Sequence, residues 1–190
     1  MGKHFDDVPL PGLDDLKARQ DVGRSVRRAD HTLRPTEAAR VSFWRRVVKA
    51  PGNGCWIFTG AVSSPDGYGR IAWRDNGRER TVSAHRFALE LAYGPLAASV
   101  VAEHKCNEPL CVRVGAEHVI QSTQRENLAY AVALGRATGP GNGTVTIKRV
   151  ARSLAVRRAV KDGWNAVAYA RAQTAGRVFN AQQPGLFDNL

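Results

Sequence analysis

The spacing of apolar residues predicts a helix, then a strand-rich middle, then further helices. Apolar residues recur at helical spacing over 37–50, and the Pro-Gly pair at 51–52 ends this helix. Three runs rich in aromatic and β-branched residues predict strands: CWIFTGA, YGRIAWR and RERTVSAHR. The Asp-Asn-Gly sequence at 75–77 joins the last two runs as a tight hairpin.

Further along, the pattern predicts a helix over 84–93, closed by a Gly-Pro pair, and then two strands in SVVAEHKC and HVIQST. The next helix begins at Thr123, because Thr123 and Glu126 have the spacing of a capping box. Short strands mixed with helices in this order predict an α+β fold.

Composition divides the chain into five segments. Charged residues of both signs with little apolar periodicity predict a mobile N-terminal arm, and the run ATGPGNGT predicts a linker. The predicted segments are the arm (1–34), a compact domain (35–136), the linker (137–144), a basic helical extension broken near Gly163 (145–180) and a tail (181–190).

The charge of the chain indicates a polyanionic partner. The sequence holds 28 Lys and Arg against 17 Asp and Glu, a net charge of +11, and basic proteins gain affinity for nucleic acid by releasing its counterions. No run approaches the roughly 18 apolar residues of a membrane-spanning helix, so a membrane partner is not expected. The start MGKHFDDVPLPG lacks an apolar signal core, and we therefore expect an intracellular protein.

Three cysteines and one histidine have the spacing of a zinc site. An odd number of cysteines without a secretion signal argues against a disulfide framework. Structural zinc takes four sulfur or nitrogen ligands, and Cys55, Cys106, Cys111 and His118 complete such a set. The alternative is that the cysteines are small buried hydrophobic residues and that His118 is an ordinary histidine.

His104 and Asn127 have the side chains that phosphodiester hydrolysis needs. His104 ends a predicted strand beside the zinc ligands, where it could take a proton from water, and the amide oxygen of Asn127 suits Mg²⁺. Two strands joined by a metal-bound loop and followed by a helix would place the two side chains on opposite walls of one cleft. Alternatively, His104 is a surface histidine and Asn127 lies on a solvated helix face.

The order GCWIFTG, SPDGYGRIAW, AHRFALELAYGP, VVAEHKCNEPLC, HV and TQRENL resembles the HNH endonucleases, in the phage-type and His-Cys box branch of the ββα-metal superfamily. The resemblance spans about residues 52–136. It implies a ββα-metal nuclease core with a preceding β-hairpin region and structural zinc, flanked by helices and flexible termini. It also implies His104 as general base, Asn127 as the ligand of catalytic Mg²⁺, and the three cysteines with His118 as ligands of structural Zn²⁺. Glu103 stands where many members carry a metal-binding aspartate, so it is a candidate second Mg²⁺ ligand.

Arginines supply candidate phosphate contacts. An arginine near the scissile phosphate would stabilise the transition state, and Arg86 is the first choice, with ion pairing to Glu90 as the alternative. The hairpin arginines could enter a DNA groove as part of a two-stranded ribbon, or they form a solvated face. These hairpin residues are Arg70, Arg74, Arg78 and Arg80.

The tail AQQPGLFDNL resembles the short peptide by which bacterial replication and repair proteins bind the sliding clamp. Leu186 and Phe187 would enter a pocket on the clamp while Gln183 forms a hydrogen bond at its rim. The alternative is that Leu186 and Phe187 pack on the core of the protein itself.

Together these features predict a Mg²⁺-dependent endonuclease acting on double-stranded DNA, recruited by the sliding clamp to replicating or repaired DNA. It would act in the cytoplasm, at the nucleoid, of a bacterial or phage-infected bacterial cell. Cutting both strands with one site per chain would call for a homodimer. Two alternatives are a zinc-stapled DNA-binding module whose catalysis has lapsed, and a protein that binds or cleaves RNA.

Overall fold

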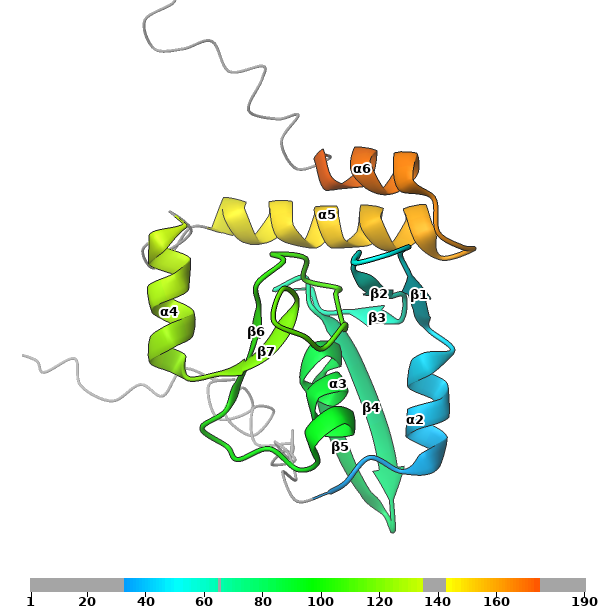
Figure 1. Cartoon of the computed structure of the whole chain (residues 1–190). Helices are drawn as coiled ribbons and strands as arrows, with labels where there is room; N and C mark the ends of the chain where they lie inside the picture. Colours follow the sequence, from blue (N-terminus) through cyan, green and yellow to red (C-terminus); the bar gives the residue numbers. More distant parts are fainter. Residues whose placement is uncertain (1–32, 65, 135–142, 175–190) are drawn as a thin grey trace, which may run out of the picture.

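The computed structural model describes residues 33–64, 66–134 and 143–174, and its fold is α+β, as the sequence predicts (Figure 1). The described helices are α2 (Glu37–Trp44), α3 (Ala84–Tyr93), α4 (Gln124–Ala133), α5 (Gly143–Val160) and α6 (Ala166–Thr174). The described strands are β1 (Val47–Lys49), β2 (Trp56–Phe58), β3 (Ala61–Val62), β4 (Gly69–Asp75), β5 (Arg78–Ser83), β6 (Val101–His104) and β7 (Val119–Ser122).

The strands form three small antiparallel sheets, with the orders β1-β2, β3-β4-β5 and β6-β7. Asn76 and Gly77 have φ angles of 49° and 74°, and Asn and Gly adopt this left-handed conformation at low cost, so the hairpin predicted at 75–77 is present. β6, β7 and α4 follow one another as strand, strand and helix, and α4 contacts β6. The predicted capping box begins α4: Thr123 Oγ1 accepts from the Glu126 amide, and the Glu126 carboxylate accepts from the Thr123 amide at 2.8 Å.

The first helix is shorter than its apolar pattern predicts. It ends at Trp44, and Val47–Lys49 form β1 instead of the last helical turn. The two β-branched valines favour an extended chain, and pairing with Ile57 and Phe58 in β2 supplies the backbone partners. A sheet contact that forms across a loop has therefore overridden the local helical periodicity.

The larger of the two hydrophobic clusters lies where α2, α3 and the β4–β5 hairpin meet. Phe43, Phe58 and Phe87 are fully buried, and the ring of Phe43 lies 5.5 Å from that of Phe58 and 4.9 Å from that of Phe87. Burying each ring contributes roughly 2 kcal/mol. Leu33 is also buried, and the carbonyl of Arg34 accepts a hydrogen bond from Trp73 Nε1, so this domain includes the last two residues of the predicted arm 1–34.

The second cluster joins α5 and α6 to the rest of the protein. Val156 and Val160 of α5 are fully buried with Ile57 and Leu110, so the segment predicted as a separate basic extension packs on the core (Figure 1). α5 also begins at Gly143, inside the predicted linker. None of the described helices is long and apolar enough to cross a membrane.

Arg80, predicted to contact DNA, is buried instead. It is 4% exposed, and its guanidinium donates to both carboxylate oxygens of Glu90, at 2.6 and 2.8 Å, and to the carbonyl of Leu33. Its side chain points to the same face of β5 as Val82 because side chains alternate along a strand. The assignment of Arg80 to a DNA-binding ribbon is therefore wrong.

Candidate functional site

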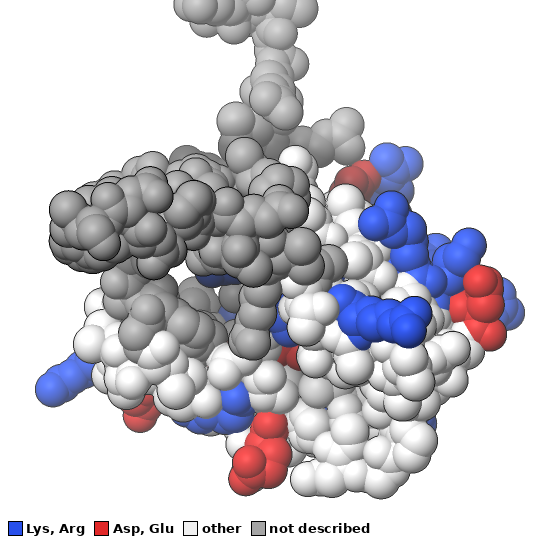
Figure 2. All heavy atoms as spheres, turned by 90° about the horizontal axis from the view of Figure 1, so that it is seen from above, with Lys and Arg blue, Asp and Glu red and all other residues white. Residues whose placement is uncertain are grey.

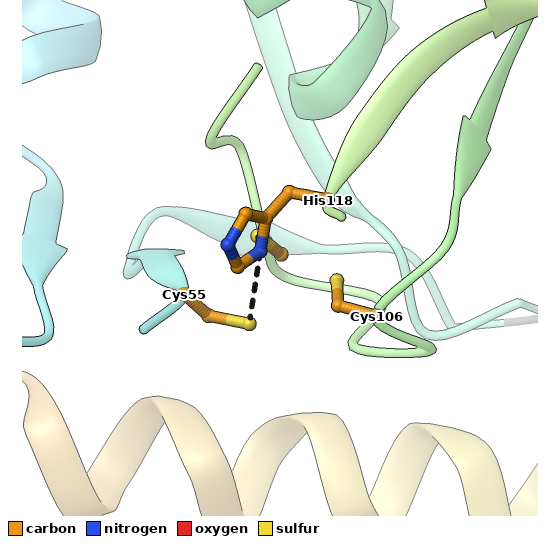
Figure 3. Close-up of side chains that lie close together, drawn as sticks. Cys55, Cys106 and His118 are labelled. Atoms are coloured by element: carbon orange, nitrogen blue, oxygen red, sulfur yellow. Dashed lines mark hydrogen bonds between the residues drawn. The ribbon is translucent and has the colours of Figure 1, made fainter. Parts of the chain in front are cut away.

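The predicted zinc ligands meet in one cluster. The ligand atoms of Cys55, Cys106, Cys111 and His118 all lie within 4.8 Å of one another. His118 Nδ1 is 3.7 Å from the sulfurs of Cys55 and Cys111, and Figure 3 shows Cys55, Cys106 and His118 pointing toward one another. In a tetrahedral zinc site, sulfur and nitrogen ligands are about 3.6 Å apart. The cluster can therefore hold a metal ion such as zinc.

Backbone contacts hold the segments that carry these ligands. Leu110 and Val112 bond to the edge of β2 that does not pair with β1: the Phe58 amide donates to the Leu110 carbonyl and the Val112 amide to the Trp56 carbonyl, each at 2.8 Å. His118 Nε2 donates to the Asn53 carbonyl at 2.9 Å, which leaves the lone pair of a neutral ring on Nδ1, facing the sulfurs. The cluster thus has the imidazole tautomer that binds metal.

The thiols also have the electrostatics of a metal site. Hydrogen bonds from Cys111 and Cys55 hold the pKa of the Cys106 thiol well below its usual range. Their contacts with Cys106 raise the pKa of Cys55 to about 12, and that of Cys111 is also raised. Three adjacent sulfurs cannot all be thiolates without a nearby cation, so a divalent metal fits this donor set.

His104 and Asn127 line one cleft of about 400 Å³. His104 comes from the end of β6 and Asn127 from the first turns of α4, which is the arrangement expected for two strands followed by a helix. Polar and charged side chains line most of the remaining wall: Tyr68, Arg70, Ser83, His85 and Arg149. Two of the predicted catalytic residues therefore face the same space.

The ring of His104 is fixed on several sides. Its Nε2 donates to the carbonyl of Cys111 at 2.9 Å, so a neutral ring carries its lone pair on Nδ1. The Tyr68 ring is almost parallel to it, with an interplanar angle of 5° and centroids 5.7 Å apart, and the His85 ring lies 4.3 Å away. Because Cys111 also belongs to the metal cluster, the same loop holds both sites.

His85 belongs to the cleft although the sequence analysis gave it no role. Its ring is 7% exposed, Nε2 lies 3.3 Å from Ser83 Oγ, and Nδ1 is buried with no hydrogen-bond partner among the described residues. Burial lowers the pKa of His85 well below its usual value, and the charges of His104, Arg70 and Arg86 add to this effect. His85 is therefore a neutral ring that packs against His104.

Arg86 and Glu103 do not line the cleft. Arg86 donates to carbonyl oxygens of the 96–100 loop and pairs with Glu90 at 3.3 Å, as in the alternative considered for it. Glu103 is 2% exposed, and its Oε1 accepts from Lys105 Nζ at 2.6 Å. Its Oε2 is buried without a hydrogen-bond partner in the described part of the chain.

The other residues predicted to contact DNA or the sliding clamp do not lie together. Arg70 lines the cleft and pairs with Asp66 at 2.6 Å, whereas Arg74 pairs with Glu79 on the surface. Arg78 is exposed in the hairpin. The predicted clamp-binding residues Gln183, Leu186 and Phe187 lie outside the described residues.

Sequence reasoning also missed Tyr68 and Arg149 as members of the cleft. Tyr68 begins a run that predicts only a strand, and Arg149 lies in a segment that predicts only a basic helix. No local pattern identifies them, because each reaches the cleft through packing between distant segments. For His85, the weak signal was its place next to Arg86 in the family motif.

Comparisons with known proteins give one weak relationship. The chain is 37% identical over 82 residues to Protein 7.7 of Escherichia phage T7, a match that spans 43% of this chain and 58% of that relative. The chain thus covers little more than half the length of this relative, whose name states no activity. No protein-family model matches the chain, and no solved structure matches it significantly.

Proposed function

We propose that the protein is a metal-dependent DNA endonuclease of the HNH and His-Cys box type. The observation that carries the proposal is the environment of His104, a fixed ring that faces a polar cleft together with Asn127. The relationship to a protein of a phage that infects Escherichia supports action in a phage-infected bacterial cell.

In this proposal the four-ligand cluster binds zinc as a structural element. All four positions of a tetrahedral ion would be filled by protein, so no position remains for substrate or water, which is typical of structural zinc. The zinc would fix the loop that carries the Cys111 carbonyl, and through it the orientation of His104.

His104 acts as the general base. With its proton on Nε2 held by the Cys111 carbonyl, Nδ1 accepts a proton from water as the water oxygen attacks the phosphorus and the bond between phosphorus and the 3′ oxygen breaks, so that the 3′ oxygen leaves. The stacked Tyr68 ring and the neutral His85 ring keep the imidazole from turning.

Asn127 would hold the catalytic cation. The Asn127 side chain offers a hard oxygen in the cleft, whereas Glu103, the second candidate ligand, does not line the cleft and pairs with Lys105. When bound, Mg²⁺ would stabilise negative charge on the scissile phosphate and the 3′ oxygen.

The test is cleavage of supercoiled plasmid in Mg²⁺ by the zinc-loaded full chain. We expect the wild-type protein to cleave and His104→Ala to lose on the order of 10²- to 10⁴-fold in rate. The control is Gln121→Ala on the neighbouring strand, which is exposed and should cleave like the wild type. Plasmid binding without cleavage by any of the three proteins would instead favour the lapsed DNA-binding module, and preference for structured RNA in competition would favour an RNA partner.

The proposal includes recruitment by the sliding clamp. A peptide covering 182–190 should bind a bacterial clamp saturably, and Leu186→Ala with Phe187→Ala should abolish the binding. Equal binding of the native and doubly substituted peptides would remove the clamp as a partner and leave the endonuclease proposal intact.

A further inference from the structure

Arg149 of α5 reaches the cleft from outside the strand, strand and helix unit. It lines the cleft that contains His104 and Asn127. It also lines an adjoining groove of about 440 Å³, together with Arg152 and again His104. The cleft and the groove share Tyr68, His104 and Arg149. The phosphates of a nucleic-acid strand could therefore run through both spaces, past the histidine, and stay close to basic side chains throughout.

The position of α5 beside the cleft is fixed by close packing. Gly67 has a φ of 73°, and a Cβ atom there would lie 3.0 Å from Ser153 Oγ and 3.1 Å from the Arg149 carbonyl oxygen. Only glycine therefore lets the turn before Tyr68 approach α5 so closely. Further along the helix, Arg157 donates to the Gly60 carbonyl at 3.1 Å.

A buried carboxylate joins α5 to the metal-binding loop. Glu108 is 1% exposed, accepts from Arg152 Nη2 at 3.0 Å and from the Leu110 amide at 3.2 Å, and lies 3.4 Å from the Tyr169 hydroxyl. The loop that orients His104 and the helix that carries Arg149 are thus connected directly.

The arginines near His104 differ in whether their charge is already neutralised. Arg70 pairs with Asp66, Arg152 pairs with Glu108, and Arg86 is held by Glu90 and backbone carbonyls. The Arg149 guanidinium is exposed and forms no hydrogen bond or ion pair with the residues that the structure describes. Seen from above, where α5 and α6 lie, the described surface carries more Lys and Arg than acidic side chains (Figure 2).

We propose that Arg149 binds a phosphate of the DNA backbone in the cleft beside His104, and that α5 forms a wall of the substrate site. This inference rests on the proposed endonuclease function and assigns to Arg149 the role first expected of Arg86. A guanidinium can donate two parallel hydrogen bonds to phosphate oxygens and stabilise charge that develops there.

The test compares Arg149→Gln with a matched variant on the same helix. Arg158→Gln is the control, because Arg158 is also exposed on α5 but lies about 13 Å further along its axis, in the groove between α5 and α6. We expect Arg149→Gln to lower kcat/KM for plasmid cleavage on the order of 10²-fold, and Arg158→Gln to stay near the wild type. Arg149→Lys should recover only part of the loss, because lysine keeps the charge but not the paired donors.

DNA binding gives a readout that does not depend on cleavage. In a His104→Ala background, Arg149→Gln should lower the slope of log affinity against log salt by about 0.9, the share of one phosphate contact. Unfolding temperatures should not change, since the side chain is exposed. The inference would be overturned if the wild-type protein cleaves DNA and Arg149→Gln has no effect, or if both glutamine variants have equal effects. A wild-type protein that neither cleaves nor binds DNA would instead overturn the proposed function.

Discussion

Two histidines lie at the two ends of the loop between β6 and β7; both are largely buried, His104 at 9% exposed, but they face different surroundings. His118 is 5% exposed, with one ring nitrogen bound by a carbonyl and the other 3.7 Å from two sulfurs. His104 also has one nitrogen bound by a carbonyl, but it lines an open cleft with Asn127. The same residue type can therefore point into a metal-binding cluster or line a cleft, depending on the segments packed around it.

Under the proposed function, the two surroundings separate a structural role from a chemical one. A metal site whose four positions are filled by protein stabilises a fold, whereas a reactive site keeps a position open for water or substrate. If this contrast is right, changes at the closed site should alter folding first, and changes at the open site should alter activity while folding stays the same.

The largest effect is expected at the closed site. Cys106→Ser should abolish zinc binding and, with it, the folded state, because structural zinc contributes roughly 10 kcal/mol in small metal-dependent folds, comparable to the whole stability of a domain. Thermal unfolding by circular dichroism, with metal content by mass spectrometry, checks this. Treating the wild type with a strong chelator should have the same effect. An unchanged unfolding temperature in metal-free wild type would show that the cysteines are simple buried residues and not metal ligands.

Arg80 and Arg74 test the contrast between a buried and an exposed ion pair within one hairpin. Arg80→Met leaves the buried Glu90 with only the longer 3.3 Å pair to Arg86 and should cost about 3 kcal/mol of unfolding free energy. Arg74→Met is the control and should cost under about 1 kcal/mol, because its pair with Glu79 is on the surface. Urea denaturation measures both. Similar costs for the two variants would show that burial of the pair has no influence on stability.

Asn127→Ala should affect the open site alone. We expect the Mg²⁺ concentration for half-maximal cleavage to rise, with activity falling roughly 10- to 100-fold, since a metal ligand is lost. Zinc content and unfolding temperature should remain those of the wild type. Gln124→Ala, exposed in the same turn of α4, is the control. Loss of zinc from Asn127→Ala would show that the two sites are not separate.

The smallest effect concerns the start of α4, which positions Asn127. Hydrogen bonds from the amide and hydroxyl of Thr123 lower the pKa of Glu126 below its ordinary value of 4.5. Its contribution to helix stability is therefore present above pH 4.5 and is lost as the pH falls through the lowered pKa. Hydrogen-exchange protection in the first turn of α4 should fall over this acid range. Glu126→Gln should remove the acid step because it has no carboxylate to titrate, and an identical pH profile in that variant would contradict the assignment.

Much of the site follows from local sequence spacing. The cysteines and His118 form a metal-ligand pattern, Thr123 and Glu126 form the capping box, and the Asp-Asn-Gly turn forms the hairpin. These features depend on residues close in sequence or on ligands with strict chemistry, and the structure confirms them.

The differences arise where distant segments meet. Val47–Lys49 pair with β2, and Val156 of α5 enters the second core, and neither contact leaves a trace in local periodicity. Arg80 is an exception, because alternation in β5 places it on the inward face with Val82 and so gives a usable signal. The general preference of arginine for the surface outweighed that signal in the sequence analysis.

Cys111 contributes its sulfur to the metal cluster and its backbone carbonyl to His104. A carbonyl group is present whichever amino acid occupies a position, so the orientation of His104 is specified by the path of the loop and not by the identity of residue 111. During divergence, a descendant could lose the thiol and still orient the histidine, provided that another interaction kept the loop on the same path. The orientation of His104 can thus be inherited separately from the metal-binding cluster.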